Sequence, residues 1–136
     1  MKEGDKVKIG DEEWDVLSAY SRAQAIEDGI LVDVNAVAPD LIKNAGIKFH
    51  VAMTNTVWGE YVEVPEGVVG QDWKGRLWDI LSLFRFAAKG AATDLIYFSV
   101  LVRNDARPPK EVRFKAVCGP GDDTEPVITI MREDED

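Results

Sequence analysis

The most continuous apolar stretch of the chain runs from about Arg76 to Lys89. Aliphatic and aromatic residues occupy most of its positions, and Gly90 follows directly as a helix stop. The polar residues form only one narrow stripe, made of Asp79, Ser82, Arg85 and Lys89. A helix that is apolar over most of its circumference is typical of a buried element. We therefore expect this helix to be central to the core and covered on several sides.

Three segments after this helix have the composition of β-strands: residues 94–103, 111–118 and 126–131. The connections between them, 104–110 and 119–125, are rich in proline, glycine and aspartate, which favours turns between antiparallel neighbours. The first segment is apolar on both faces, which is typical of a central strand, whereas the second alternates charged and apolar residues. These segments predict an antiparallel three-strand meander.

The first half of the chain predicts shorter elements. Ser21 is a suitable N-cap and Gly29 a suitable stop for a two-turn helix, and Thr54 or Asn55 begins another short helix. The full set is a hairpin at 7–17, helices at 21–29, 35–46 and 54–61, and strands at 30–34 and 49–53. We therefore expect an α+β fold, in which an antiparallel sheet with a C-terminal three-strand meander packs on one core helix beside several short helices.

Length and composition indicate one domain spanning residues 1–136, because the chain has the usual size of a single domain and contains neither repeats nor linkers. Its single cysteine, Cys118, fits a reducing compartment. No secretory or membrane-spanning segment stands out, so we expect a cytoplasmic protein without a membrane partner.

The formal net charge of −9 is concentrated at the ends of the chain. Residues 1–15 carry six acids and three bases, and residues 132–136 carry four acids and one base. We interpret both acidic flanks as solvated tails.

The residues that could support catalysis or bind a metal form no recognisable motif. His50 is the only histidine, and we expect it to be a hydrogen-bonded strand residue rather than a general base. Cys118 precedes the segment 119–123, a glycine-rich turn that lacks the residues of a phosphate-binding loop or an EF-hand. One histidine and one cysteine cannot supply the usual ligands of zinc or iron, so we expect no cofactor and no metal.

Two groups of residues leave alternative functions open. A guanidinium near the interior must pair with a carboxylate or bind an anion, so one alternative is a small ligand- or nucleotide-binding domain or enzyme, with a pocket built from Tyr20, Arg22, Asp33, Arg76 and Asp79. The other is nucleic-acid binding through a basic hairpin that contains Arg107, Lys110, Arg113 and Lys115. The acidic charge of the whole chain disfavours the second alternative.

Three stretches, 20–34, 75–81 and 115–130, together resemble an uncharacterised family of small bacterial proteins of unknown function, carried on plasmids, phages and related mobile elements. The resemblance covers the chain from about Val16 onward and is most specific in its C-terminal stretch. It implies a one-domain accessory protein and supplies no reaction or catalytic residue. Our leading hypothesis is a non-enzymatic protein-binding or regulatory protein whose partner is encoded by the host or by the element.

Overall fold

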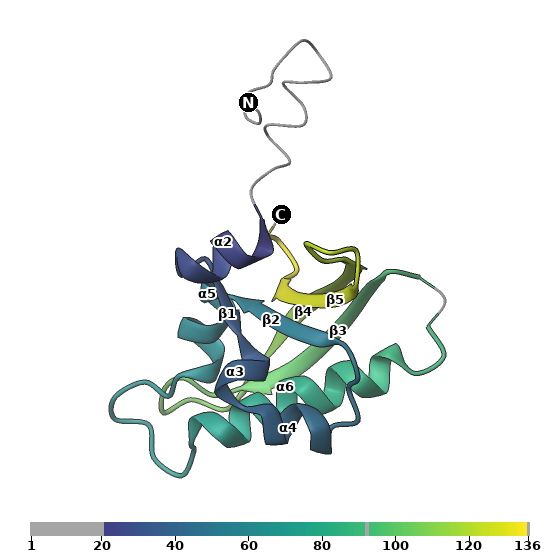
Figure 1. The fold of residues 1–136 in the computed structure, drawn as a ribbon. Helices are drawn as coiled ribbons and strands as arrows, with labels where there is room; N and C mark the ends of the chain where they lie inside the picture. The colour runs from purple at the N-terminus through teal and green to yellow at the C-terminus, as the bar shows by residue number, and fades with distance from the viewer. Residues whose placement is uncertain (1–20, 92, 136) are drawn as a thin grey trace.

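The computed structural model describes residues 21–91 and 93–135, so the predicted hairpin at 7–17 and the N-terminal flank lie outside the described residues (Figure 1). The strands are β1 (Leu31–Asp33), β2 (His50–Thr54), β3 (Leu95–Val102), β4 (Lys110–Pro120) and β5 (Pro126–Arg132). The helices are α2 (Arg22–Glu27), α3 (Val34–Val37), α4 (Pro39–Asn44), α5 (Asn55–Val57), the π-helical segment η1 (Trp58–Val62) and α6 (Trp73–Ala88).

The five strands form one mixed sheet in the order β1-β2-β5-β4-β3. The pairs β3–β4 and β4–β5 are antiparallel, which confirms the C-terminal meander and the α+β class. The sheet differs from the prediction in one pair, because β2 runs parallel to β5, with His50 opposite Val127. A parallel pair needs a long crossover. Here the crossover includes α6, β3 and β4, so no local turn signal announces it.

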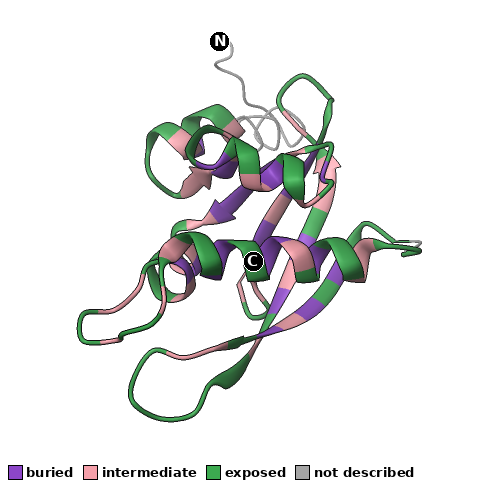
Figure 2. Cartoon of the chain, turned by 90° about the horizontal axis from the view of Figure 1, so that it is seen from below, coloured by how far each residue is buried: buried purple, intermediate pink, exposed green. Residues whose placement is uncertain are grey.

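Helix α6 packs across one face of the sheet and supplies the centre of the core (Figures 1 and 2). Phe84 is 2% exposed, and its ring lies 5.9 Å from that of Phe98 on β3. Phe98 in turn contacts Phe114 on β4, at 5.6 Å between ring centroids. This row of aromatic rings joins the helix to the meander.

Two expectations about the surroundings of α6 and β3 are wrong. The sheet covers one side of α6, and η1 and α4 also contact it, but the outer side is open to solvent, where Phe86 is 76% exposed. Strand β3 lies at the edge of the sheet rather than at its centre. The apolar residues that suggested burial on all sides therefore reach the surface on both elements.

No helix in the described part of the chain is long and apolar enough to span a membrane.

Side-chain caps hold the first turns of four helices; two of them, Ser21 and Thr54, were predicted from the sequence, and Asp33 and Asp72 were not. The side chains of Ser21, Asp33, Thr54 and Asp72 accept hydrogen bonds from the first turns of α2, α3, α5 and α6, respectively. Helices of three to six residues are not stable alone. They are ordered because these caps and the sheet hold them in place.

The C-terminal flank is attached to the body, contrary to our expectation of a solvated tail. One carboxylate oxygen of Glu135 accepts hydrogen bonds from the Thr54 hydroxyl at 2.9 Å and from the Arg132 amide at 2.8 Å. Glu133 forms an ion pair with Arg113 at 2.8 Å. These acidic residues therefore connect the C-terminal flank to the ends of β2 and β5 and to Arg113 on β4.

The two faces of α6 predict opposite responses to truncation of a phenylalanine. Phe84→Ala should lower the free energy of unfolding by about 3–5 kcal/mol, because it leaves a cavity between the helix and the sheet. Phe86→Ala should change it by less than about 1 kcal/mol, because the ring already lies in solvent. Denaturant titration of both variants measures the difference, and equal losses would contradict the one-sided packing.

Candidate functional site

Arg76 is buried, at 6% exposure, and its guanidinium binds neutral groups of the protein. Its guanidinium donates to the side-chain oxygen of Gln71 at 3.1 Å, and to the backbone oxygens of Glu63 and Arg103. It also donates to the side-chain oxygen of Asn104. The Arg76 guanidinium thus binds three segments of the chain at once: the end of η1, the residues just before α6 and the β3–β4 connection.

The neighbours of Arg76 complete a polar network. The Gln71 amide donates to the same Arg103 oxygen at 3.1 Å, and the Asn104 amide donates to the backbone oxygen of Glu60 at 2.9 Å. Burial lowers the pKa of Arg76 from its usual value. Asp79 lies one turn further along α6 and lines the same shallow surface hollow. Since four N–H groups of Arg76 already bind protein acceptors, the arrangement is that of a structural clamp.

Arg22 lies on the outer face of the sheet, which we define as the face turned away from α6. It donates to the Thr129 hydroxyl and to the backbone oxygen of Ile128, both at 2.7 Å. Burial is the largest influence on its pKa and lowers it, while the carboxylates of Asp122 and Asp33 act in the opposite direction. This guanidinium fastens α2 to β5.

The Asp33 carboxylate lies 2.8 Å from Nε2 of His50 and also caps α3 by accepting a hydrogen bond from the Ala36 amide at 3.2 Å. The four described members of the predicted ligand pocket therefore occupy two places: Arg22 and Asp33 on the outer face, and Arg76 and Asp79 beside the N-terminal half of α6. Tyr20 lies outside the described residues. Ligand binding by these residues stays a prediction.

The glycine-rich segment 119–123 is a turn whose side chain reaches α2. The Asp122 carboxylate accepts hydrogen bonds from the backbone amides of Arg22 at 2.8 Å and Ala23 at 3.0 Å. These two bonds lower the pKa of Asp122. The carboxylate thus satisfies two amides that a helix N-terminus leaves free.

Neither the surroundings of Cys118 nor the arrangement of possible metal ligands supports a catalytic site among the described residues. Burial raises the pKa of the Cys118 thiol, and the nearby Asp94 carboxylate raises it further. A reactive thiolate needs the opposite surroundings, with positive charge close by. Among the described residues, no three histidine, cysteine or carboxylate side chains gather as a metal ion would require.

The basic hairpin is partly engaged by the protein itself. Arg113 pairs with Glu133 and also lies over the ring of Tyr97, at 5.1 Å from the ring centroid. Arg107 lies 3.9 Å from Asp105 in the connection between β3 and β4. Lys110 begins β4, and Lys115 lies opposite Tyr97. The four residues therefore lie along the β3–β4 hairpin, and nucleic-acid binding by them stays a prediction.

The open edge of β3 is the feature of this molecule that most needs an explanation. In the described part of the chain, only β4 pairs with it. Its eight residues contain no charge and no proline, and its register with β4 runs unbroken from Leu95 to Val102. Soluble proteins normally protect edge strands with charges, prolines or bulges, because unpaired backbone groups recruit another strand.

The hydrogen-bond pattern shows which backbone groups of β3 point away from β4. The Cys118 amide donates to the Asp94 oxygen at 2.8 Å, so residues 94 and 118 form a hydrogen-bonded pair. In an antiparallel ladder such pairs alternate with non-bonded ones. The amides and carbonyls of residues 96, 98 and 100 therefore point toward β4, and those of residues 95, 97, 99 and 101 point away from the sheet. Among these, the Leu95 oxygen already accepts a hydrogen bond from the Thr93 hydroxyl at 2.7 Å.

The side chains next to this edge are exposed and largely apolar. On the outer face, Leu101 is 67% exposed, and Leu95, Tyr97 and Val117 are 42%, 44% and 38% exposed. We call the group of Leu95, Tyr97, Ser99, Leu101 and Val117 the β3 edge surface. The only signal in the sequence is that residues 95–102 contain no charge and no proline, and this signal cannot place the strand at an edge.

Comparison with known proteins identifies the family. Residues 11–136 match the model of a family of unknown function (DUF6573), and the chain belongs to this family. The match begins a few residues before the resemblance expected from Val16 onward. No curated protein and no solved structure is similar enough to match the chain.

The clamp makes Arg76 a strong determinant of stability. Arg76→Lys should lower the free energy of unfolding by about 2–4 kcal/mol, because one ammonium cannot reach four acceptors and leaves buried groups unsatisfied. Arg85→Lys on the exposed side of the same helix is the control and should change it by less than about 0.5 kcal/mol. Similar denaturation midpoints for the two variants would contradict the clamp.

Asp122 predicts a pH-dependent contribution to stability. Because folding lowers its pKa, its stabilising effect is present above its unfolded pKa and is lost as the pH falls through the folded value. Asp122→Asn should therefore melt below the wild type at pH 7, and the gap should close below about pH 4. Asp123→Asn, which changes the adjacent exposed carboxylate, should show no such gap. A gap that persists in acid would contradict the assignment.

Proposed function

We propose that this protein is a non-enzymatic binding protein that adds a strand of a partner protein to the open edge of β3. The partner segment is extended, apolar at alternate positions and acidic. We further propose that the protein is cytoplasmic and serves a bacterial plasmid, phage or related element, whose own or host protein supplies that segment.

The observation that carries this proposal is the unprotected edge itself. Four residues at alternate positions of β3, namely 95, 97, 99 and 101, direct their backbone amides and carbonyls away from the sheet. An incoming strand that pairs with them gains main-chain hydrogen bonds, and side-chain contacts supply specificity. No catalytic arrangement of comparable definition exists among the described residues.

The side chains beside the edge favour the stated partner chemistry. Leu95, Tyr97 and Leu101 offer apolar contacts at alternate positions on the outer face. Arg113 and Lys115 lie on the same face in the next strand, opposite Ser99 and Tyr97. Because Arg113 is already paired with Glu133, Lys115 is the cation of this pair that favours a carboxylate on the approaching chain, which increases the association rate and helps to fix the register.

The mobile-element setting rests on the resemblance of the stretches 20–34, 75–81 and 115–130. Nucleic-acid binding has less support than a protein partner, because Arg113 is already paired with Glu133 and stacked on Tyr97. The chain also carries a formal net charge of −9, which repels a polyanion.

A proline placed on the free edge tests the proposal. Ser99→Pro removes an outward amide without removing a bond to β4, whereas Ser99→Ala keeps the amide and is the matched control. A partner captured by the wild type from host cells, then identified and purified, should bind Ser99→Ala normally. It should bind Ser99→Pro at least about tenfold more weakly, because main-chain hydrogen bonds across the edge are lost.

Amide hydrogen exchange locates the contact at single residues. The amides of residues 95, 97, 99 and 101 should exchange rapidly in the isolated protein and slowly in the complex, while those of 96, 98 and 100 are slow in both. A partner that leaves the first set unprotected, or that binds Ser99→Pro at full strength, would overturn the proposal. Slow exchange of that set in the isolated protein would show that the chain's own residues or a second copy already cover the edge, and would also overturn it.

A further inference from the structure

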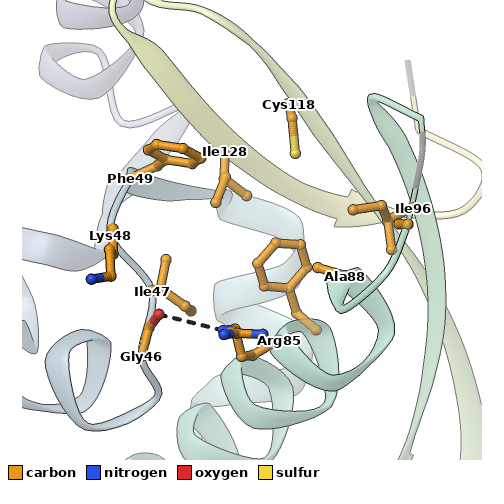
Figure 3. Close-up of a pocket in the computed structure, with 11 residues that line it drawn as sticks. Gly46, Ile47, Lys48, Phe49, Arg85, Ala88, Ile96, Cys118 and Ile128 are labelled. Carbon is orange, nitrogen blue, oxygen red and sulfur yellow. Dashed lines mark hydrogen bonds between the residues drawn. The ribbon is translucent and has the colours of Figure 1, made fainter.

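A second feature, on the opposite side of the sheet from the β3 edge surface, is an apolar pocket of about 360 Å³. It opens between the segment leading into β2, the C-terminal part of α6 and the ends of β4 and β5 (Figure 3). The volume lies at the lower end of the roughly 300–1,000 Å³ typical of small-molecule sites. Its walls are formed mainly by Ile47, Phe49, Phe84, Ala88, Ile96 and Ile128.

The walls of the pocket are rigid parts of the core, while its mouth is open. Phe84 is 2% exposed and Ile128 is 3% exposed, so both belong to packed elements. Phe49 stands at the mouth with 48% of its surface exposed. An apolar space of this kind offers water few hydrogen-bond partners, so an apolar ligand group gains by replacing it.

The charged groups around the pocket are arranged asymmetrically. Arg85 and Lys48 belong to the lining, which contains no carboxylate. The Arg85 side chain makes one long hydrogen bond, from Nε to the Gly46 oxygen at 3.4 Å (Figure 3). Lys48 is exposed, and its side chain points away from Arg85 in Figure 3. Exposed side chains change rotamer within nanoseconds, so this ammonium can turn toward the mouth of the pocket.

The opposite end of the pocket disfavours an anion. Cys118 lies there, across the pocket from Arg85 (Figure 3). Its backbone amide donates to the Asp94 oxygen at 2.8 Å, so Asp94 lies next to it, and the Asp94 carboxylate contributes to the raised pKa of the thiol. An anionic headgroup is therefore attracted to the end with Arg85 and repelled from the end with Cys118. The charges thus select both the sign and the orientation of a bound amphiphile.

We infer that this pocket binds a small aliphatic carboxylate. The carboxylate lies beside the Arg85 guanidinium within reach of Lys48, and the hydrocarbon chain lies along Phe84 and Ile128 toward Cys118. This site is independent of the protein-binding edge, because the sheet separates the two surfaces.

Calorimetric titration with decanoate tests this inference, with decyltrimethylammonium as the probe of equal chain length and opposite charge. Decanoate should bind saturably with one site per chain, and the cation should bind at least about fivefold more weakly. Arg85→Gln should weaken decanoate binding by about fivefold, whereas Lys89→Gln, an exposed position of the same helix end outside the lining, should leave it unchanged.

The single cysteine reports whether the ligand occupies this pocket. Decanoate should slow alkylation of Cys118 by iodoacetamide in proportion to the occupancy found by calorimetry. Ala88→Phe, which fills the space, should abolish decanoate binding, and a folded Arg85→Gln variant keeps the test valid if Ala88→Phe unfolds. No binding up to millimolar decanoate, equal binding of the cationic probe, or binding unaffected by Arg85→Gln would overturn the inference.

Discussion

The position of α6 relative to the rest of the chain depends on one buried cation. Arg76 has no carboxylate among its contacts, so its burial is tolerated only while neutral oxygens from three segments surround it. That requirement brings the end of η1 and the β3–β4 connection against the first turns of α6. The clamp and the aromatic row through Phe84, Phe98 and Phe114 together fix which side of the sheet the helix covers.

Once α6 covers one face, the other face has to be closed by short elements, and it is closed only in part. Over β5, Arg22 and Asp122 hold α2 by complementary contacts: the guanidinium binds β5, and the carboxylate binds the helix N-terminus. At the other end of the sheet, β3 and the adjoining part of β4 keep Leu95, Tyr97, Leu101 and Val117 exposed. The outer face of the sheet is therefore covered by α2 over β5, whereas its apolar side chains stay exposed over β3 and the adjoining part of β4.

The two arginines that the sequence singled out both bind groups of the protein itself. Sequence reasoning gave weight to Arg22 and Arg76 because a partly buried guanidinium must find an acceptor, and that physical argument was sound. The acceptors are backbone oxygens, a hydroxyl and side-chain amides of the protein itself. The β3 edge surface and the pocket beside Arg85, on which our two proposals rest, are made largely of apolar residues without a motif.

The sequence alone determined the local structure: Ser21, Thr54 and the turn-rich connections marked where elements begin and end, because capping and turn formation involve residues close in the chain. It also determined the α+β class and the meander. Only the tertiary structure decided that β2 pairs in parallel with β5, that β3 is an edge and that Phe86 lies in solvent. A continuous apolar strand or helix has the same sequence whether the chain itself or a partner covers it. Which of the two applies is decided by contacts between residues far apart in the sequence, and among the described residues those contacts leave the outer edge of β3 without a partner strand.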